Sequence, residues 1–192
     1  AQNQQPIGMD WPQWRGPNRD GFISKDSPWP HTLSQKKLSL AWRKEIGKGY
    51  SGPITSDSLV FTVETKGKNE VVRAFDRSSG QQKWESQWTG SMSVPFFAWK
   101  NGSWIRSTPV FDGENLWVTN LEHSILDPLI CDKTACPLPF KVSKINPQNY
   151  KVVQSWIFAG EPFGLPSVAI PISNEMISGE IFVGSFRSDR LA

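Results

Sequence analysis

The sequence predicts an all-β protein built from repeated units of short antiparallel strands. Aromatic residues are abundant, with 10 Trp and 11 Phe among 192 residues, and rings of this size build a core without many aliphatic side chains. The 15 Gly and 15 Pro interrupt every long window, and no stretch has a strong helical period, so helix is expected to be scarce. A strand-and-turn frame also recurs along the chain, as repeat architectures require.

The repeated frame is a small residue, a proline, a short strand, a polar turn and a longer aromatic and β-branched strand. Its prolines, Pro53, Pro109 and Pro166, are 56 and 57 residues apart. A proline is tolerated at the first residue of a strand because its missing N–H is not needed there. Each frame therefore predicts the first two strands of a meander, and the longer strands are expected in residues 57–63, 112–118 and 179–183.

The second half of the first unit contains a turn with clear local chemistry, in the pattern Ala74-x-Asp76-x-x-x-Gly80-x-x-x-Trp84. The Asp76 side chain can accept hydrogen bonds from backbone N–H groups two residues further on. Gly80 supplies a positive φ, which a Cβ atom would resist. Trp84 follows within a polar–aromatic–polar alternation, so a returning strand is expected after the turn.

The second unit repeats this turn with more drift, in residues 144–153. Asn146 takes the place of the aspartate, and Asn149 is expected in the left-handed position. No tryptophan stands at the same offset as Trp84, since Trp156 lies further on.

Units of about 40–50 residues with four strands each are typical of propeller blades. We therefore expect a partial β-propeller of four-stranded antiparallel blades. Residues 1–38 form a wrapping N-terminal arm, and residues 39–192 form blades at about 39–90, 91–160 and, incompletely, 161–192. A closed propeller needs about four blades. The chain is thus a fragment of a larger propeller, is completed by a protein partner or a second copy, or is an open meander.

Several segments of the chain resemble secreted bacterial propellers with pyrroloquinoline-quinone-like (PQQ-like) repeats. They are the lead Trp11-Pro-Gln-Trp-Arg-Gly-Pro-Asn-Arg-Asp-Gly21, the Ala74–Trp84 turn, and segments 42–44, 47–53 and 102–109. The resemblance covers residues 10–118. It implies that the turn tryptophan packs against the neighbouring blade. The tail, residues 179–190, weakly resembles gluconolactonase-like propellers.

The cofactor does not follow from this resemblance. Quinone dehydrogenases of this type use adjacent cysteines, a calcium ligand set and an aspartate base, and this sequence has no adjacent cysteines and no carboxylate pair in such a context. We therefore expect no catalytic, cofactor-binding or metal residue. PQQ or calcium would be expected only if the chain is part of a larger propeller.

The two cysteines, Cys131 and Cys136, lie in an expected insertion at residues 121–140. A disulfide that closes this loop is the favoured interpretation. Two free thiols are an alternative, and a metal site that includes His123 is a weaker one, because four-ligand spacing is absent.

Aromatic and basic residues near strand ends form a candidate partner surface. Packing over the sheet ends and ordinary salt bridges are the alternatives. We expect the tryptophans of the arm, Trp11, Trp14 and Trp29, to dock onto the blades. The candidate surface consists of Phe96, Phe97, Trp99, Trp104, Arg106, Arg187 and Arg190.

The glycine-rich segment 47–52 lacks the sequence of a phosphate loop and leads into a strand, so it is expected to form the bend that enters a blade. The net charge of +3 is too small to indicate nucleic-acid binding. No apolar run approaches the roughly 18 residues of a transmembrane helix.

A polar lead after Ala1 is what signal-peptide removal leaves, and trimming gives the same start. We therefore expect a periplasmic or extracellular protein. The expected function is a non-catalytic binding or scaffold module of an assembly. The alternative is a piece of a quinone- or metal-dependent oxidoreductase or lactonase-like hydrolase.

Overall fold

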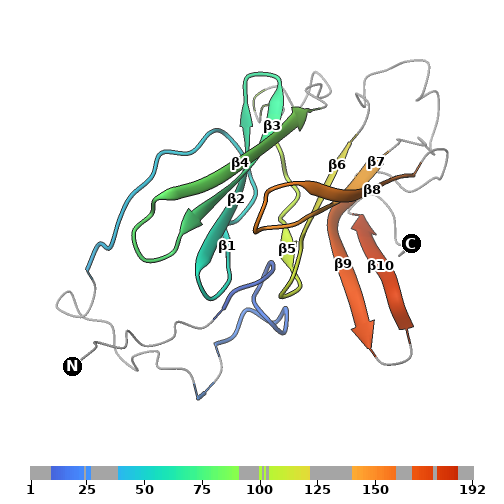
Figure 1. Ribbon diagram of the computed structural model, residues 1–192, viewed down its shortest axis with the longest axis horizontal. Coiled ribbons are helices and arrows are strands. Elements are labelled where there is room, and N and C mark those ends of the chain that lie inside the picture. The colour runs from blue at the N-terminus through green and yellow to red at the C-terminus, as the bar shows by residue number, and fades with distance from the viewer. Residues whose placement is uncertain are drawn as a thin grey trace.

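The computed structural model describes residues 10–23, 25–26, 39–90, 100, 102, 104–121, 140–158 and, as backbone, 166–174 and 177–185. Throughout these residues the fold is all-β, with two four-stranded antiparallel sheets, one two-stranded sheet and no α-helix. The expected all-β class and the four-stranded antiparallel units are confirmed. The described strands form a stack and not a closed ring (Figure 1), so a propeller remains a proposal.

The first sheet is a meander of β1 (Ile54–Thr55), β2 (Leu59–Lys66), β3 (Asn69–Asp76) and β4 (Gln82–Thr89), paired in sequence order. Its register places Ala74 opposite both Phe61 on β2 and Trp84 on β4. Residues that alternate along a strand point to opposite faces, so these three side chains share one face of the sheet.

The second sheet repeats this order with β5 (Val110–Phe111), β6 (Leu116–Leu121), β7 (Phe140–Ile145) and β8 (Val152–Phe158). A third, two-stranded sheet follows, in which β9 (Pro166–Asn174) pairs with β10 (Ile177–Ser185).

The three sheets lie one after another, with the first and third at opposite ends of the stack (Figure 1). Strand β9 lies beside β5 and β6, and β1 lies beside β5. The first strands of the two larger sheets are therefore neighbours.

The main core lies between the first and second sheets. Both sheets contribute alternating apolar side chains, as expected of strands that each have one face turned toward this core. The buried residues are Ile54, Phe61, Val63, Val72, Ala74 and Trp84 from the first sheet, and Ile105, Leu116, Val118 and Ile145 from or beside the second.

The opposite face of the second sheet has a core of its own, made of Val110, Trp117, Phe140 and Val142 with Trp156 and Phe158 packed against them. The rings of Trp117 and Trp156 are stacked with centroids 5.7 Å apart, and those of Phe140 and Phe158 are 4.8 Å apart. Because both faces are apolar, the second sheet is an inner layer of the stack.

The N-terminal arm connects the two larger sheets near their first strands. Trp11 exchanges backbone hydrogen bonds with Thr55, at 3.1 and 2.9 Å, and Phe111 N donates to the carbonyl of Pro12 at 2.8 Å. Residues 10–12 thus lie against β1 and β5 together.

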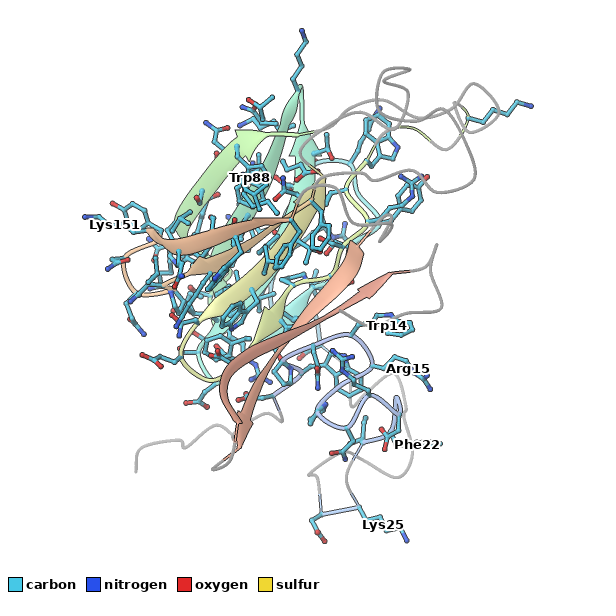
Figure 2. All side chains as sticks on the ribbon, turned by 90° about the vertical axis from the view of Figure 1, so that its right-hand side faces the viewer. Trp14, Arg15, Phe22, Lys25, Trp88 and Lys151 are labelled. Carbon is cyan, nitrogen blue, oxygen red and sulfur yellow. The ribbon has the colours of Figure 1, made fainter. Side chains whose placement is uncertain are left out.

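The rest of the arm's loop projects from the sheets. Gly16 has a φ of +81° and lies so close to the Trp11 ring that a Cβ there would be 2.8 Å from it. Trp14 is 62 % exposed and Phe22 is 75 % exposed, and both point away from the sheets (Figure 2). The expectation that Trp14 docks onto the blades is therefore wrong, because the loop folds onto Trp11 and leaves Trp14 outside.

No helix long and apolar enough to cross a membrane is found in the part of the chain that the structure describes.

Candidate partner-binding surface

The turn between β3 and β4 is organised by the Asp76 carboxylate. Its Oδ1 accepts hydrogen bonds from the backbone N–H and the hydroxyl of both Ser78 and Ser79, at 2.6–3.1 Å. Its Oδ2 lies 3.2 Å from Lys83 Nζ. The hydrogen bonds from the Ser78 hydroxyl, from Ser79 and from Lys83 hold the pKa of Asp76 well below its usual range.

Gly80 closes this turn with a φ of +68°, and its N–H donates to the carbonyl of Asp76 at 2.8 Å. A Cβ at Gly80 would be 2.6 Å from the ring of Trp42. The indole of Trp42 also donates to the carbonyl of Arg77 at 2.8 Å. The glycine is therefore required twice, once for its φ and once for the close approach of Trp42.

Trp84 lies between the two larger sheets and is 7 % exposed. Its ring is 6.1 Å from that of Phe61. Its indole donates a hydrogen bond of 2.8 Å to the carbonyl of Pro147, in the turn between β7 and β8. The last strand of the first sheet is thus tied to the far turn of the second.

The β7–β8 turn repeats the first turn with different residues in its key positions. Asn146 Oδ1 accepts from Gln148 N at 2.8 Å, and Asn146 N donates to Lys151 O at 3.0 Å. The left-handed residue is Tyr150, with a φ of +54°. The expectation that Asn149 holds this position is wrong, because the turn has the same length as the first and its left-handed residue comes four after the Asx residue in both.

The register also shows what replaces Trp84 in the second sheet. Gln154 occupies the position in the second sheet that Trp84 occupies in the first, because Gln154 lies opposite Lys144 and Trp84 lies opposite Ala74. Gln154 is exposed. Trp156, two residues further on, lies opposite Val142 and belongs to the core on the other face of the second sheet.

The candidate surface lies where the segments before β1 and β5 meet. Thr65 N donates to Lys48 O at 2.6 Å, Tyr50 N donates to Ile105 O at 2.8 Å, and Ile105 N donates to Thr65 Oγ1 at 3.0 Å. A Cβ at Gly47 would be 2.6 Å from the Thr65 carbonyl. Backbone contacts therefore fix the two segments against β2 and against each other.

On these fixed segments, cations and aromatic rings alternate. Lys48 Nζ lies 4.5 Å from the centroid of the Trp104 ring, and the Arg106 guanidinium carbon lies 4.8 Å from that of Tyr50. Each pair joins the segment before β1 to the segment before β5. Arg106 is also held by hydrogen bonds from its guanidinium to the carbonyls of Trp104, at 3.1 Å, and Gly102, at 3.4 Å. We call Lys48, Tyr50, Trp104 and Arg106 the cation–aromatic cluster.

The cluster is open to solvent and positively charged. Tyr50 is 54 % exposed, Lys48 and Arg106 are exposed, and Trp104 is half-buried. The nearby carboxylate of Glu64 is 1 % exposed and lies 2.9 Å from Arg73 Nη1, which leaves it turned inward. The surface therefore offers two cations to an anionic ligand, with the edges of two aromatic rings beside them.

The same geometry supports the expectation that the glycine-rich segment 47–52 is a bend. Gly47 N donates to Glu64 Oε2 at 2.6 Å, and Tyr50 N donates to Ile105 O. Two of the amides that a phosphate loop would turn toward its ligand are thus used inside the protein.

Of the residues expected to form a partner surface, Trp104 and Arg106 are brought together here. Phe96, Phe97, Trp99, Arg187 and Arg190 lie outside the described residues, as do Trp29, His31, His123, Cys131 and Cys136. Among the described residues, no three His, Cys, Asp or Glu side chains form a group that could hold a metal ion.

Sequence reasoning missed Lys48, Tyr50 and Trp42. In the sequence, Lys48 and Tyr50 indicate only a glycine-rich bend, because their partners are 56 residues away. One signal was available: the Lys48-Gly-Tyr50 and Trp104-Ile-Arg106 triplets each place a cation and a ring two residues apart, on one side of an extended segment.

No protein-family model and no curated protein matches this sequence.

Proposed function

We propose that this chain is a non-catalytic binding or scaffold module of a periplasmic or extracellular assembly, built on a PQQ-like propeller. Support for the architecture comes from two successive four-stranded meanders stacked face to face with their first strands side by side. The buried Trp84, whose indole reaches the turn of the next sheet, is the contact that the resemblance to PQQ-like propellers implies.

The cation–aromatic cluster is the observation that carries the binding proposal. A guanidinium or ammonium group over a ring is attracted by the ring's electron-rich face. The outward side of the cationic group stays available to an anion, and the exposed ring edges can contact apolar atoms. An acidic protein segment with an aromatic or aliphatic residue offers both features, so we take such a segment as the ligand class.

Fluorescence anisotropy with labelled ten-residue peptides tests this proposal. One set mixes Glu and Asp with Phe, and the matched set mixes Lys and Arg with Phe. The acidic set is expected to bind, with an affinity that falls as salt rises, because exposed charges contribute to the contact. The basic set is expected not to bind.

Variants of the cluster supply the controls. Arg106→Ala and Trp104→Ala are expected to weaken acidic-peptide binding by about tenfold each, which corresponds to loss of a contact worth roughly 1.4 kcal/mol. Arg15→Ala is the matched control, since Arg15 also lies over an exposed tryptophan, Trp14, at 5.6 Å, but outside the cluster. Equal binding of both peptide sets, or unchanged binding by Arg106→Ala and Trp104→Ala, would refute the proposed surface.

A further inference from the structure

Thr65 is a polar residue at a position where the pattern of β2 calls for an apolar one. Phe61, Val63 and Thr65 alternate along the strand, so their side chains point to the same face of the first sheet. Phe61 and Val63 are buried in the core between the two larger sheets. Thr65 is 5 % exposed, and a buried hydroxyl costs free energy unless it is hydrogen-bonded. The Thr65 hydroxyl therefore needs a partner.

This partner lies in the segment before β5. Ile105 N donates to Thr65 Oγ1 at 3.0 Å, and among the described residues no carbonyl oxygen accepts this N–H. Ile105 stands between Trp104 and Arg106, the two residues that this segment contributes to the cation–aromatic cluster. The Thr65 hydroxyl thus holds the backbone from which both of these side chains extend.

The main chain of Thr65 holds the other half of the cluster. Thr65 N donates to Lys48 O at 2.6 Å, and Tyr50 N donates to Ile105 O at 2.8 Å. With the bond from Ile105 N to Thr65 Oγ1, these contacts form a closed ring of three hydrogen bonds through Thr65, residues 48–50 and Ile105. Two of the three join backbone groups, which do not depend on the side chain present. Only the third depends on the identity of a side chain.

We propose that Thr65 is a positioning residue of the cation–aromatic cluster. Its hydroxyl fixes the segment before β5 so that Trp104 lies under Lys48, at 4.5 Å, and Arg106 lies over Tyr50, at 4.8 Å. Thr65 itself is buried and does not contact the ligand. The proposal rests on the acidic-ligand surface proposed above and names the residue that sets the geometry of that surface.

Thr65→Val tests this role, because it replaces the hydroxyl with a methyl group of similar size and leaves the Ile105 N–H without its acceptor. Thr62→Val is the matched control. Thr62 lies on the same strand and is 8 % exposed, and its hydroxyl has no hydrogen-bond partner in the described part of the chain. Thr65→Ser keeps the hydroxyl and is expected to behave as the wild type. Circular dichroism confirms that each variant is folded, and Thr65→Ala replaces Thr65→Val if the latter is not.

NMR measures the geometry of the cluster without any ligand. The ring current of Tyr50 shields the Arg106 guanidinium group, so Tyr50→Leu marks where the Arg106 Nε–H signal lies without the ring. In Thr65→Val this signal is expected to move toward its position in Tyr50→Leu. In Thr62→Val and Thr65→Ser it is expected to stay at the wild-type position. An Arg106 signal that Thr65→Val leaves unmoved overturns the proposal.

Binding of the acidic peptides measures the consequence for the surface. Thr65→Val is expected to weaken their binding by about fivefold, and Thr62→Val is expected to leave it unchanged. In an Arg106→Ala background the further loss caused by Thr65→Val is expected to be less than about twofold, because part of what Thr65 positions is then absent. An equal loss in both backgrounds would show that Thr65 does not act through Arg106, and this would also overturn the proposal.

The two proposals fail separately. If the binding surface is wrongly assigned, the wild type does not distinguish acidic from basic peptides, but Thr65→Val still moves the Arg106 signal. If the positioning role is wrongly assigned, the wild type binds acidic peptides and Arg106→Ala weakens this binding, but Thr65→Val changes neither the signal nor the affinity.

Discussion

The indole of Trp84 donates its N–H to the carbonyl of Pro147, 63 residues away, across the interface of the two larger sheets. The ring is 7 % exposed and lies in the core shared by both sheets. Trp84 therefore contributes both a large buried ring and a hydrogen bond to the contact between the two larger sheets. The stacking of the sheets is expected to depend strongly on this residue.

Replacement of Trp84 separates these two contributions. Trp84→Ala is expected to lower the free energy of unfolding by about 3–5 kcal/mol, since it leaves a large cavity. Trp84→Phe keeps most of the apolar area and loses the hydrogen bond, so a loss of about 1–2 kcal/mol is expected. Urea unfolding followed by circular dichroism measures both. Trp14→Ala, at an exposed tryptophan, is the control and is expected to change the stability by no more than about 0.5 kcal/mol.

Gly80 and Gly67 form a matched pair that isolates the contact of Trp42. Both have a left-handed φ, +68° and +63°, so an alanine at either position is expected to cost about 1–2 kcal/mol in backbone strain. Only at Gly80 would the new Cβ meet the Trp42 ring, whereas nothing lies within 4 Å at Gly67. Gly80→Ala is expected to cost at least about 1 kcal/mol more than Gly67→Ala in urea unfolding. Equal costs would show that Trp42 moves aside freely.

Tyr150 offers a stabilising substitution. It has a φ of +54°, and its side chain is 54 % exposed. Glycine relieves a strain of about 1–2 kcal/mol and loses about 0.5–1 kcal/mol through the greater freedom of the unfolded chain. Tyr150→Gly is therefore expected to raise the free energy of unfolding by up to about 1 kcal/mol. Tyr150→Ala keeps a Cβ and is expected to give no gain in the same thermal or urea measurement.

The turn at Asp76 predicts a specific pH dependence of stability. Hydrogen bonds from Ser78 and Ser79, with Lys83 nearby, lower the pKa of Asp76 in the folded protein. A carboxyl whose pKa is lower in the folded than in the unfolded state stabilises the fold above its unfolded value, near 3.9. This stabilisation is lost as the pH falls below about 4 toward the folded-state pKa.

Thermal unfolding of the wild type and of Asp76→Asn between pH 7 and pH 2 measures this contribution. The variant is expected to be less stable at pH 7, and the difference between the two proteins is expected to shrink below about pH 4. A difference that stays constant over the whole range would show that the charge of Asp76 does not contribute.

The turns and strands of this protein could be read from the sequence because their causes are local. The aspartate and the glycine of the β3–β4 turn act within five residues of each other, and Asp76 and Gly80 are used as expected. The sequence also predicts the position of the second turn, but residue propensity favours Asn149 as its left-handed residue. The backbone path, with the Asn146 N–H bonded to Lys151, puts Tyr150 there in spite of its Cβ.

Only two of the four residues of the cation–aromatic cluster could be predicted from the sequence. Trp104 and Arg106 stood out as aromatic and basic residues at a strand start. Their partners, Lys48 and Tyr50, come from the segment before the first sheet and meet them only when the two sheets stack. No pattern within one segment specifies such a pairing, because it depends on the distance and angle between sheets.

The all-β class, the repeated strand pairs and the chemistry of the turns follow from the sequence alone, since alternation and turn propensity act over a few residues. Only the tertiary structure showed that Trp42 and Trp84 make the same contact on successive sheets. The two tryptophans have different neighbours along the chain, and their acceptors are 35 and 63 residues away. The equivalence arises from stacking, which aligns equivalent turns in space whatever the lengths of the segments between them.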